Sequence, residues 1–356
     1  MPIPYLTRRA PWFSMLVHFR EKADMYRVGA TAFLRQYSDD DDDYERKVCM
    51  FHPVVASELT FGMDTAICGE LVMVMRRADM LLTPTGRADV MDAIDLAVER
   101  GSRVIGLGGF TSVVTEGGKL VAERVPSSVT VTNGNAYTAA VVRSNVVDVV
   151  EALQLGRPAR VGVVGCTGSV GVATSWMLAN GGHELILVGR TIDRIKERLP
   201  GLAGDHRCED NVAALTDADV VVLLTSSPDA QLQPAHVRPG AVVLDATEPV
   251  NIQPEALAEF EAAGATVLRS GRAHIPNYRS SSDLGPETPP PYAYACFAET
   301  YLFAREGIRE HSVGLPSPAQ AEAIEQIAAR HGVSPRPLEL DLVRARATAA
   351  TSGGVR

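Results

Sequence analysis

The sequence predicts an α/β fold: a doubly wound parallel sheet with a second α/β substrate domain. From Arg160 onward, short apolar segments alternate with helical patterns, as buried parallel strands and their connecting helices do. The expected strands are residues 161–164, 184–188, 219–225, 241–246 and 265–268. A glycine-rich turn follows the first of them, and a further strand that ends in glycines lies upstream.

The upstream strand is Arg103–Leu107, and it ends in Gly108-Gly109-Phe110-Thr111-Ser112. A strand followed by glycines and small hydroxyl residues is typical of a ligand-facing turn in α/β proteins, although a purely structural turn fits the same residues. Helices are expected around it. Their apolar spacing and end signals place them over 61–82, over 87–100 and from the turn at 133–135 to about Leu155.

Charge and composition bound the function. The 356 residues include 34 Lys+Arg and 43 Asp+Glu, a net charge of −9, whereas nucleic-acid-binding proteins usually present a basic face. No run approaches the roughly 18–20 apolar residues of a membrane span, and the N-terminal segment 1–20 lacks a signal-peptide core. The five cysteines include no CxxC pair, so no disulfide framework or metal site is indicated. We expect a cytoplasmic protein without a nucleic-acid partner.

The N-terminal segment 1–60 stands apart in charge. The run Asp39–Asp43 is interpreted as a solvated acidic loop, because five adjacent carboxylates repel one another. Residues 1–38 carry a local excess of four positive charges, to which Arg8, Arg9 and Arg20 contribute. This basic stretch either faces an acidic partner or forms an ordinary surface helix.

The turn after the strand 161–164 has the pattern Gly-x-x-Gly-x-x-Gly, and a helix follows it to about Asn180. Glycines let the backbone approach a pyrophosphate, which the free N–H groups of the helix start then bind. The placement between two strands predicts a Rossmann dinucleotide site. Its expected residues are Gly165, Cys166, Thr167, Gly168, Ser169, Val170 and Gly171, with Thr225 and Ser226 after a later strand.

The end of the second strand predicts which cofactor binds. NAD-specific folds usually place an acidic residue there, whereas this chain has Gly189-Arg190-Thr191, with Arg194 one turn later. Guanidinium groups suit a 2′-phosphate, which favours NADPH over NADH. The alternative is that Arg190 is an ordinary surface arginine at a helix start.

A candidate nucleophile follows the Ser- and Pro-rich loop 270–291. Cys296 is expected in the first two turns of a helix, where the dipole favours a thiolate, and Glu299 follows on the same face. By spacing alone, a buried structural cysteine is the better interpretation. His274, in the loop after the last sheet strand, is the candidate general acid, although a lone loop histidine is more often simply exposed.

Five separated blocks together resemble the long-chain acyl-(acyl carrier protein) reductases of cyanobacteria. The blocks are LGGFTS (107–112), TNGNAYTA (132–139), VGVVGCTGSVG (161–171), the strand end Gly189-Arg190, and YACFAE (294–299). The similarity runs from about Asp64 to Leu338. The segment 1–60 and the loop 271–291 depart from the family pattern, and Cys166 stands where the family's turn usually has alanine.

The resemblance implies an NADPH-dependent reduction of an acyl thioester to a fatty aldehyde. Cys296 would be the nucleophile that forms an acyl-enzyme, with backbone N–H groups or His274 stabilising the oxyanion. Glu299 and Ser112 would lie in the same site. The thioester donor would be acyl carrier protein or acyl-CoA, and an aldehyde-consuming enzyme is a conceivable downstream partner.

Five regions are predicted on this basis. They are a divergent N-terminal segment with the acidic loop (1–60), a substrate and catalytic domain (61–156), an NADPH-binding Rossmann domain (157–275), C-terminal helices that carry Cys296 and pack back on the substrate domain (276–340), and a flexible tail (341–356).

Other functions remain open at this stage. A shikimate-dehydrogenase-like enzyme would act by direct hydride transfer and need a Lys/Asp pair, for which Lys119 is the one lysine in the stretch 48–158. Glutamyl-tRNA reductase also couples a cysteine to NADPH, but the acidic charge disfavours binding to tRNA. A non-enzymatic NADPH-binding scaffold would show cofactor binding without thiol reactivity.

Overall fold

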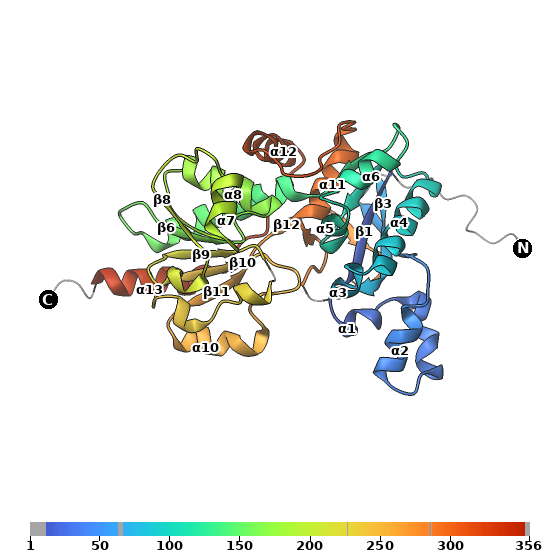
Figure 1. Cartoon of the computed structure of the whole chain (residues 1–356), viewed down its shortest axis with the longest axis horizontal. Helices are drawn as coiled ribbons and strands as arrows, with labels where there is room; N and C mark the ends of the chain where they lie inside the picture. The colour runs from blue at the N-terminus through green and yellow to red at the C-terminus, as the bar shows by residue number, and fades with distance from the viewer. Residues whose placement is uncertain (1–11, 63–66, 226, 284, 286, 353–356) are drawn as a thin grey trace, which may run out of the picture. The chain divides into compact units, whose positions relative to one another are not determined.

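The computed structural model describes residues 12–62, 67–225, 227–283, 285 and 287–352. The chain forms two compact units, which Figure 1 shows coloured along the sequence. Unit 1 comprises the chain up to Gly134, His274–Gly314 and Arg330–Val333; unit 2 comprises Asn135–Ala273, Leu315–Ala329 and the chain from Ser334. The division falls at Gly134 and not at the expected residue 156, because the helix that begins at Asn135 packs on the second sheet.

Unit 1 is built on a six-stranded sheet of order β13-β2-β3-β1-β4-β5. Its strands are β1 (Phe13–Phe19), β2 (Val54–Phe61), β3 (Cys68–Arg77), β4 (Val104–Leu107), β5 (Thr130–Thr132) and β13 (Tyr278–Ser280). β1 runs parallel to β3 and β4, and β4 runs parallel to β5, whereas β2 is antiparallel to β3 and β13. The N-terminal segment therefore supplies a central strand of unit 1.

Two helices cover opposite faces of this sheet. Ile105 and Leu107 of β4 pack in a core with α4 (Pro84–Glu99), which confirms the helix expected over 87–100. On the other face lies α11 (Ala295–Glu306), so close to β4 that a Cβ on Gly106 would stand 2.0 Å from Thr300 Oγ1. Alternating side chains of one strand point to opposite faces, as this arrangement requires. Shorter helices complete the unit: α3 (Ala78–Leu81), α5 (Phe110–Val114) and α6 (Lys119–Arg124).

The helix predicted over 61–82 is wrong, because this stretch contains the end of β2, β3 and α3. β3 reads CGELVMVMRR and is buried along most of its length. A strand buried on both faces has a near-continuous apolar sequence, which periodicity alone cannot distinguish from a helix.

The acidic run is likewise not a loop. Asp40 caps α2 (Asp41–Val48) by accepting a hydrogen bond from the Asp43 N–H, and Asp41–Asp43 form the first turn. Carboxylates are favourable at a helix N-terminus, where they meet the positive end of the dipole. Two short helices precede α2 in the chain: α1 (Lys22–Met25) and the 3-10 helix η2 (Gly29–Tyr37).

Unit 2 is a doubly wound Rossmann sheet, as predicted. Its order is β11-β10-β9-β6-β7-β8, and every neighbouring pair is parallel. The strands are β6 (Arg160–Val164), β7 (Glu184–Val188), β8 (His206–Glu209), β9 (Val220–Leu223), β10 (Val242–Asp245) and β11 (Thr266–Arg269). The order changes direction at β6, which is where ligands bind in such sheets.

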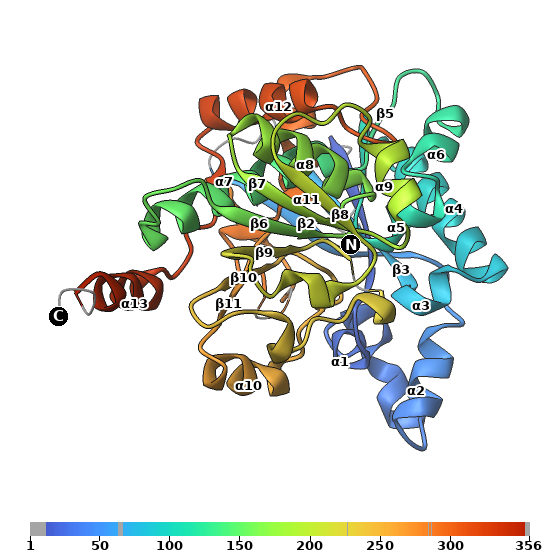
Figure 2. The ribbon, with the colours of Figure 1, turned by 60° about the vertical axis from the view of Figure 1, so that its left-hand side comes forward.

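Apolar layers cover both faces of the second sheet, and Figure 2 shows α8 and α10 on opposite sides of it. One layer includes side chains from α7 (Asn135–Leu153), α8 (Ser169–Asn180), α9 (Ile192–Arg198) and α13 (Asp341–Ser352); the other includes Phe260 of α10 (Leu257–Ala262). The tail predicted to be flexible therefore forms a helix over 341–352, with Val343 buried in the core.

The remaining elements are short apart from α12 (Pro318–Arg330). They are the strands β12 (Arg272–His274), β14 (Tyr292–Tyr294) and β15 (Ser334–Pro335), and the 3-10 helices η3 (Val212–Leu215), η4 (Pro228–Ala230), η5 (Pro234–His236) and η6 (Pro254–Ala256). Among the described residues, no helix combines the length and the apolar character needed to cross a membrane.

Candidate active site

Cys296 is the second residue of α11, directly after β14 and the helix N-cap Tyr294. The structure thus confirms the expectation that this cysteine lies at the start of a helix. The residue as a whole is half-buried, in contrast to the fully enclosed Cys166.

Gly134 presses its backbone against Cys296. A Cβ at position 134 would lie 2.2 Å from the Cys296 Cβ, and the φ of +70° favours glycine independently. Glycine is therefore required at position 134 of the block TNGNAYTA, since any side chain here would displace Cys296.

Glu299 is tied to the same place through a hydroxyl group. The Thr132 Oγ1 donates a hydrogen bond to the fully buried Glu299 carboxylate and accepts one of 3.0 Å from the Gly134 N–H. This chain of hydrogen bonds fixes the end of β5 against α11. Glu299 thereby helps to fix Gly134, whose backbone lies against Cys296.

Burial dominates the electrostatics of the thiol and raises the pKa of Cys296 to about 12. The charge of Glu299 raises this pKa further, whereas hydrogen bonds from the backbone N–H groups of Phe297, Cys296 and Gly109 lower it. The helix start lowers this pKa, in the direction expected, but desolvation outweighs it. The resting group is a thiol.

Ser112 lies in the turn after β4. Its N–H donates to the Gly109 carbonyl over 3.3 Å, and its side chain is buried in α5. The backbone N–H of Gly109, in the same turn, is the weakest of the influences on the pKa of Cys296 and lowers it.

His274 is placed differently. It is half-buried at the end of β12, and its ring packs edge-on against Tyr292 with centroids 5.8 Å apart. Its ring therefore contacts the strand β14 that precedes α11. Its role as a general acid stays a prediction.

Sequence reasoning overlooked His18, which is buried at the end of β1 and accepts a hydrogen bond from the Phe110 N–H. The available signal was a histidine that closes the apolar strand FSMLVHF.

The glycine turn of unit 2 has the form that a pyrophosphate requires. Gly165 has a φ of +88°, and a Cβ there would lie 3.0 Å from that of Thr225. A Cβ on Gly171 would stand 2.2 Å from the Gly165 carbonyl oxygen, and Gly168 is the N-cap of α8. The free N–H groups of this twelve-residue helix therefore point out of a compact turn, which fits a dinucleotide.

The other expected turn residues differ in accessibility. Thr167, Ser169 and Val170 are half-buried, whereas Cys166 is fully enclosed, with burial raising its pKa to about 12. Cys166 thus offers its backbone and not its thiol. Thr225 shapes the neighbouring loop by accepting a hydrogen bond from the Ser227 N–H, and Ser226 lies outside the described residues.

Two arginines stand beside the turn. Thr191 caps α9 by accepting from the Arg194 N–H over 3.3 Å, and the side chains of Arg190 and Arg194 are exposed. Neither guanidinium pairs with a carboxylate among the described residues. Their position at the end of β7 fits a phosphate group on the adenosine ribose.

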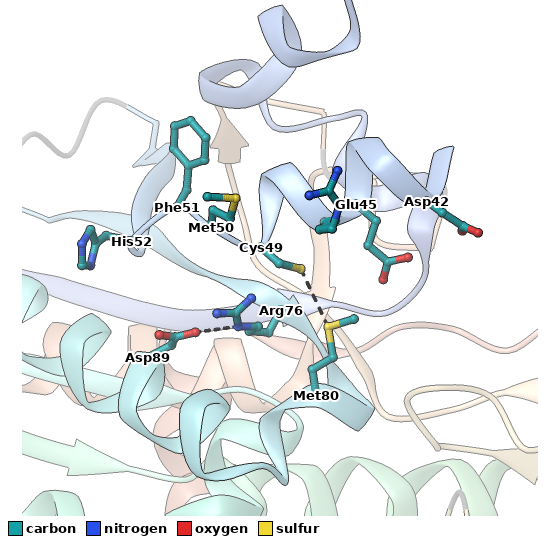
Figure 3. Close-up of a pocket in the computed structure, with 10 residues that line it drawn as sticks. Asp42, Glu45, Cys49, Met50, Phe51, His52, Arg76, Met80 and Asp89 are labelled. Atoms are coloured by element: carbon teal, nitrogen blue, oxygen red, sulfur yellow. Dashed lines mark hydrogen bonds and ion pairs between the residues drawn. The ribbon is translucent and has the colours of Figure 1, made fainter. Parts of the chain in front are cut away.

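A further cavity of about 700 Å³ lies elsewhere in unit 1, between α2, β3, α3 and the start of α4 (Figure 3). Arg76 turns toward Asp89, with 2.6 Å between Nε and the carboxylate, and Cys49 faces Met80. None of the residues predicted for the active site lines this cavity.

A curated protein resembles most of the chain. The long-chain acyl-[acyl-carrier-protein] reductase of Synechococcus elongatus is 30% identical over 271 residues, which span 72% of this chain and 78% of that protein. The chain belongs to the family of this reductase. It is an oxidoreductase, and its Rossmann unit provides the site for a nicotinamide cofactor.

Other comparisons are more limited. The aminotransferase PigE of a Serratia species is 30% identical over 184 residues, or 49% of this chain and 21% of that protein. Shikimate dehydrogenase from Aquifex aeolicus is 11% identical with a TM-score of 0.39, covering 88% of this chain and 97% of its own. The nucleotide-binding domain of glutamyl-tRNA reductase from Thermoplasma volcanium is 17% identical with a TM-score of 0.28, covering 35% and 84%. No family model matches.

Proposed function

We propose that this protein reduces an acyl thioester to an aldehyde through an acyl-enzyme on Cys296, with NADPH as the reductant. The observation that carries the proposal is the position of Cys296, a half-buried residue at the start of α11 that lies against the backbone of Gly134. Membership in the acyl-[acyl-carrier-protein] reductase family supports the same reaction.

The first step is a thiol exchange. The Cys296 sulfur forms a bond to the thioester carbonyl carbon while the bond to the carrier's sulfur breaks, and the proton of Cys296 leaves with the released thiol. Because the thiolate is the attacking form, the Cys296 proton has to leave the sulfur as the new bond forms, against the burial that raises the pKa of this thiol to about 12. Backbone N–H groups of the first turn of α11, which lower the pKa of Cys296, would stabilise negative charge on the attacking sulfur.

The second step returns the thiol. The reduced nicotinamide supplies a hydride when bound, and one further proton completes the conversion of acyl-enzyme to aldehyde and free Cys296. Gly165, Gly168 and Gly171 would hold the pyrophosphate, and Arg190 and Arg194 the 2′-phosphate. His274 is the proposed proton donor.

The thioester donor would be acyl carrier protein or acyl-CoA. Docking of an acidic carrier on the basic N-terminal stretch gains little support, because Asp24 binds both Arg20 and Arg27, and Lys22 pairs with Asp42 and Glu45. Arg8 and Arg9 lie outside the described residues. Both donors are therefore to be tested.

A product assay tests the proposed reaction. The protein is incubated with NADPH and acyl-CoA or acyl-carrier thioesters of graded chain length, and aldehyde is detected by gas chromatography with mass spectrometry. We expect aldehyde from the parent protein and none from Cys296→Ala. Equal aldehyde from both proteins would refute the acyl-enzyme route.

A further inference from the structure

We propose that Asn251 is a positioning residue for the nicotinamide cofactor: its side-chain amide holds the loop after β9 in place beside the glycine turn. The described part of this loop comprises residues 225 and 227–232, and Asn251 itself belongs to the loop after β10. This role rests on the cofactor part of the proposed function and does not require an acyl-enzyme on Cys296.

The strand order of unit 2 places the cofactor next to the loop after β9. β7 and β8 lie on one side of β6, whereas β9, β10 and β11 lie on the other (Figure 2). In an open parallel sheet, a ligand binds beyond the carboxyl ends of the strands, at the point where the strand order reverses. The two segments that meet at this point are the glycine turn after β6 and the loop after β9.

Direct contacts join these two segments. The Leu224 N–H donates to the Val164 carbonyl over 2.9 Å, which continues the pairing of β9 with β6 up to the glycine turn. A Cβ on Gly165 would lie 3.0 Å from the Thr225 Cβ. A displacement of Thr225 therefore reaches the turn that would hold the pyrophosphate.

The Asn251 amide binds the loop after β9 at three places. Its Nδ2 donates to the Thr225 carbonyl over 3.0 Å and to the Ala230 carbonyl over 3.1 Å, and its Oδ1 accepts from the Leu232 N–H over 3.1 Å. Carbonyl oxygens can only accept, so the partners fix which end of the amide faces which group. Asn251 is 5% exposed, and its bonds hold both ends of the loop.

Asn251 is in turn fixed to the sheet through Asp245, the last residue of β10. The Asn251 N–H lies 3.1 Å from the Asp245 carboxylate and 2.7 Å from the Thr247 hydroxyl oxygen. The same carboxylate, which is 1% exposed, accepts from the Thr247 hydroxyl over 2.6 Å and from the Ile252 N–H over 3.1 Å. Because buried, mutually satisfied hydrogen bonds rigidify their surroundings, the amide is a firm support for the loop.

A loop that is already in place lowers the free-energy cost of binding. The dinucleotide then does not have to order the loop when it binds, and that ordering would otherwise reduce its affinity. The switch point is used by the part of the cofactor that NADPH and NADH share, whereas Arg190 and Arg194 lie at the end of β7. Loss of the Asn251 amide should therefore weaken both cofactors alike.

Two variants remove the amide donors. Asn251→Leu removes all three bonds at similar volume, and Asn251→Asp keeps the acceptor for Leu232 but opposes a carboxylate to the two carbonyls. Asp219→Asn is the matched control. Asp219 is fully buried and accepts from the Arg160 N–H over 2.8 Å, but it lies at the opposite, amino end of β9.

Three quantities are measured at about pH 8, where an aspartate side chain is ordinarily ionised. Fluorescence titration gives the Kd of NADPH and of NADH, hydrogen–deuterium exchange of the cofactor-free protein follows residues 227–232, and chemical denaturation gives the unfolding free energy. We expect both Asn251 variants to bind NADPH and NADH about tenfold more weakly and to exchange the loop amides about tenfold faster. Asp219→Asn should keep the parent's Kd even where its unfolding free energy falls.

Unchanged Kd values in the Asn251 variants would overturn the proposal. An equal loss of affinity in Asp219→Asn would overturn it as well, because the effect would then follow from general destabilisation, and so would a loss confined to NADPH. If neither Asn251 variant folds, exchange in the parent decides: a protected Leu232 amide is expected, and rapid exchange of this amide contradicts the proposal.

The acyl-enzyme is tested without any cofactor, so the two proposals fail separately. A parent protein that forms no acyl adduct, while the Asn251 variants lose affinity for both dinucleotides, contradicts the proposed function and leaves the positioning role standing. An acyl adduct on Cys296 together with unchanged dinucleotide affinity in the Asn251 variants gives the reverse result.

Discussion

The pKa of Cys296 is governed by its burial and by neighbouring groups as well as by its place at a helix start. Desolvation holds the sulfur as a thiol, and the opposing influence comes from three backbone N–H groups. Glycines 109 and 134 make this arrangement sterically feasible, since a side chain at either position would meet His18 or Cys296. One glycine in each of the blocks LGGFTS and TNGNAYTA is therefore explained by a close contact, with His18 and with Cys296 respectively.

Replacing Gly134 by alanine tests the close contact with the nucleophile. The new Cβ would stand 2.2 Å from the Cys296 Cβ at a φ of +70°, so both a clash and backbone strain arise. We expect a loss of about 3 kcal/mol or more in unfolding free energy, measured by chemical denaturation. Gly156→Ala is the control, with a similar φ of +66° but open space around it, and should cost about 1 kcal/mol. Equal losses would mean that no clash exists.

Replacing Glu299 by glutamine tests the charge behind the thiol. The amide oxygen can still accept from Thr132, but the negative charge that raises the pKa of Cys296 is gone. The thiol pKa should fall, and alkylation of Cys296 by iodoacetamide at fixed pH should become roughly two- to tenfold faster. Glu306→Gln, at the far end of α11, should leave the rate unchanged. A slower Glu299→Gln variant would contradict this account.

At the scale of elements, the two halves of the chain differed in how well the sequence predicted them. In unit 2 five of the six strands were recognised in order, because glycine or polar turns bound them, whereas β8 was missed because its side chains are exposed or half-buried and give no apolar run. In unit 1, β3 is buried on both faces and was mistaken for a helix, and the acidic run was mistaken for a loop although Asp40 caps α2. His18 was missed because its partners, the Phe19 carbonyl and the Phe110 N–H, are backbone groups that no side-chain motif reveals.

The arginines at the junction of β7 and α9 predict a preference for NADPH over NADH. Arg190 and Arg194 are exposed there, with no carboxylate partner among the described residues. The double variant Arg190→Ala/Arg194→Ala should weaken NADPH binding by about ten- to a hundredfold and leave NADH binding nearly unchanged, because only NADPH carries the 2′-phosphate. Fluorescence titration measures both constants. Arg207→Ala, on β8 and paired with Asp217, is the control; similar losses for both cofactors would exclude a specific phosphate contact.

For the molecule as a whole, the chain combines a Rossmann unit with a unit that holds a thiol, and both are needed for the proposed reaction. The buried imidazole of His18 makes the free energy of unfolding depend on pH. The pKa of His18 lies below 6.5 because burial disfavours the charged ring. The unfolded chain therefore binds a proton at a higher pH than the folded protein does, and stability declines as pH falls below about 6.5.

This linkage gives a prediction for the parent protein and His18→Gln. Between about pH 7 and about pH 5 the parent should lose unfolding free energy more steeply than the variant, by up to about 1.4 kcal/mol per pH unit. Chemical denaturation at several pH values measures the slopes, and His52→Asn should follow the parent, because the His52 side chain is 92% exposed. Parallel slopes for parent and His18→Gln would show that His18 is not the buried proton-sensitive group.

The central claim is the acyl-enzyme on Cys296, and intact-protein mass spectrometry tests it most directly. The parent protein and Cys296→Ala are mixed with a long-chain acyl thioester in the absence of NADPH. An acyl adduct on the parent alone, discharged as aldehyde when NADPH is added, is the predicted result. Clear NADPH binding with no adduct from any thioester would contradict the account, leave Cys296 structural and make a dehydrogenase that transfers hydride directly the better description.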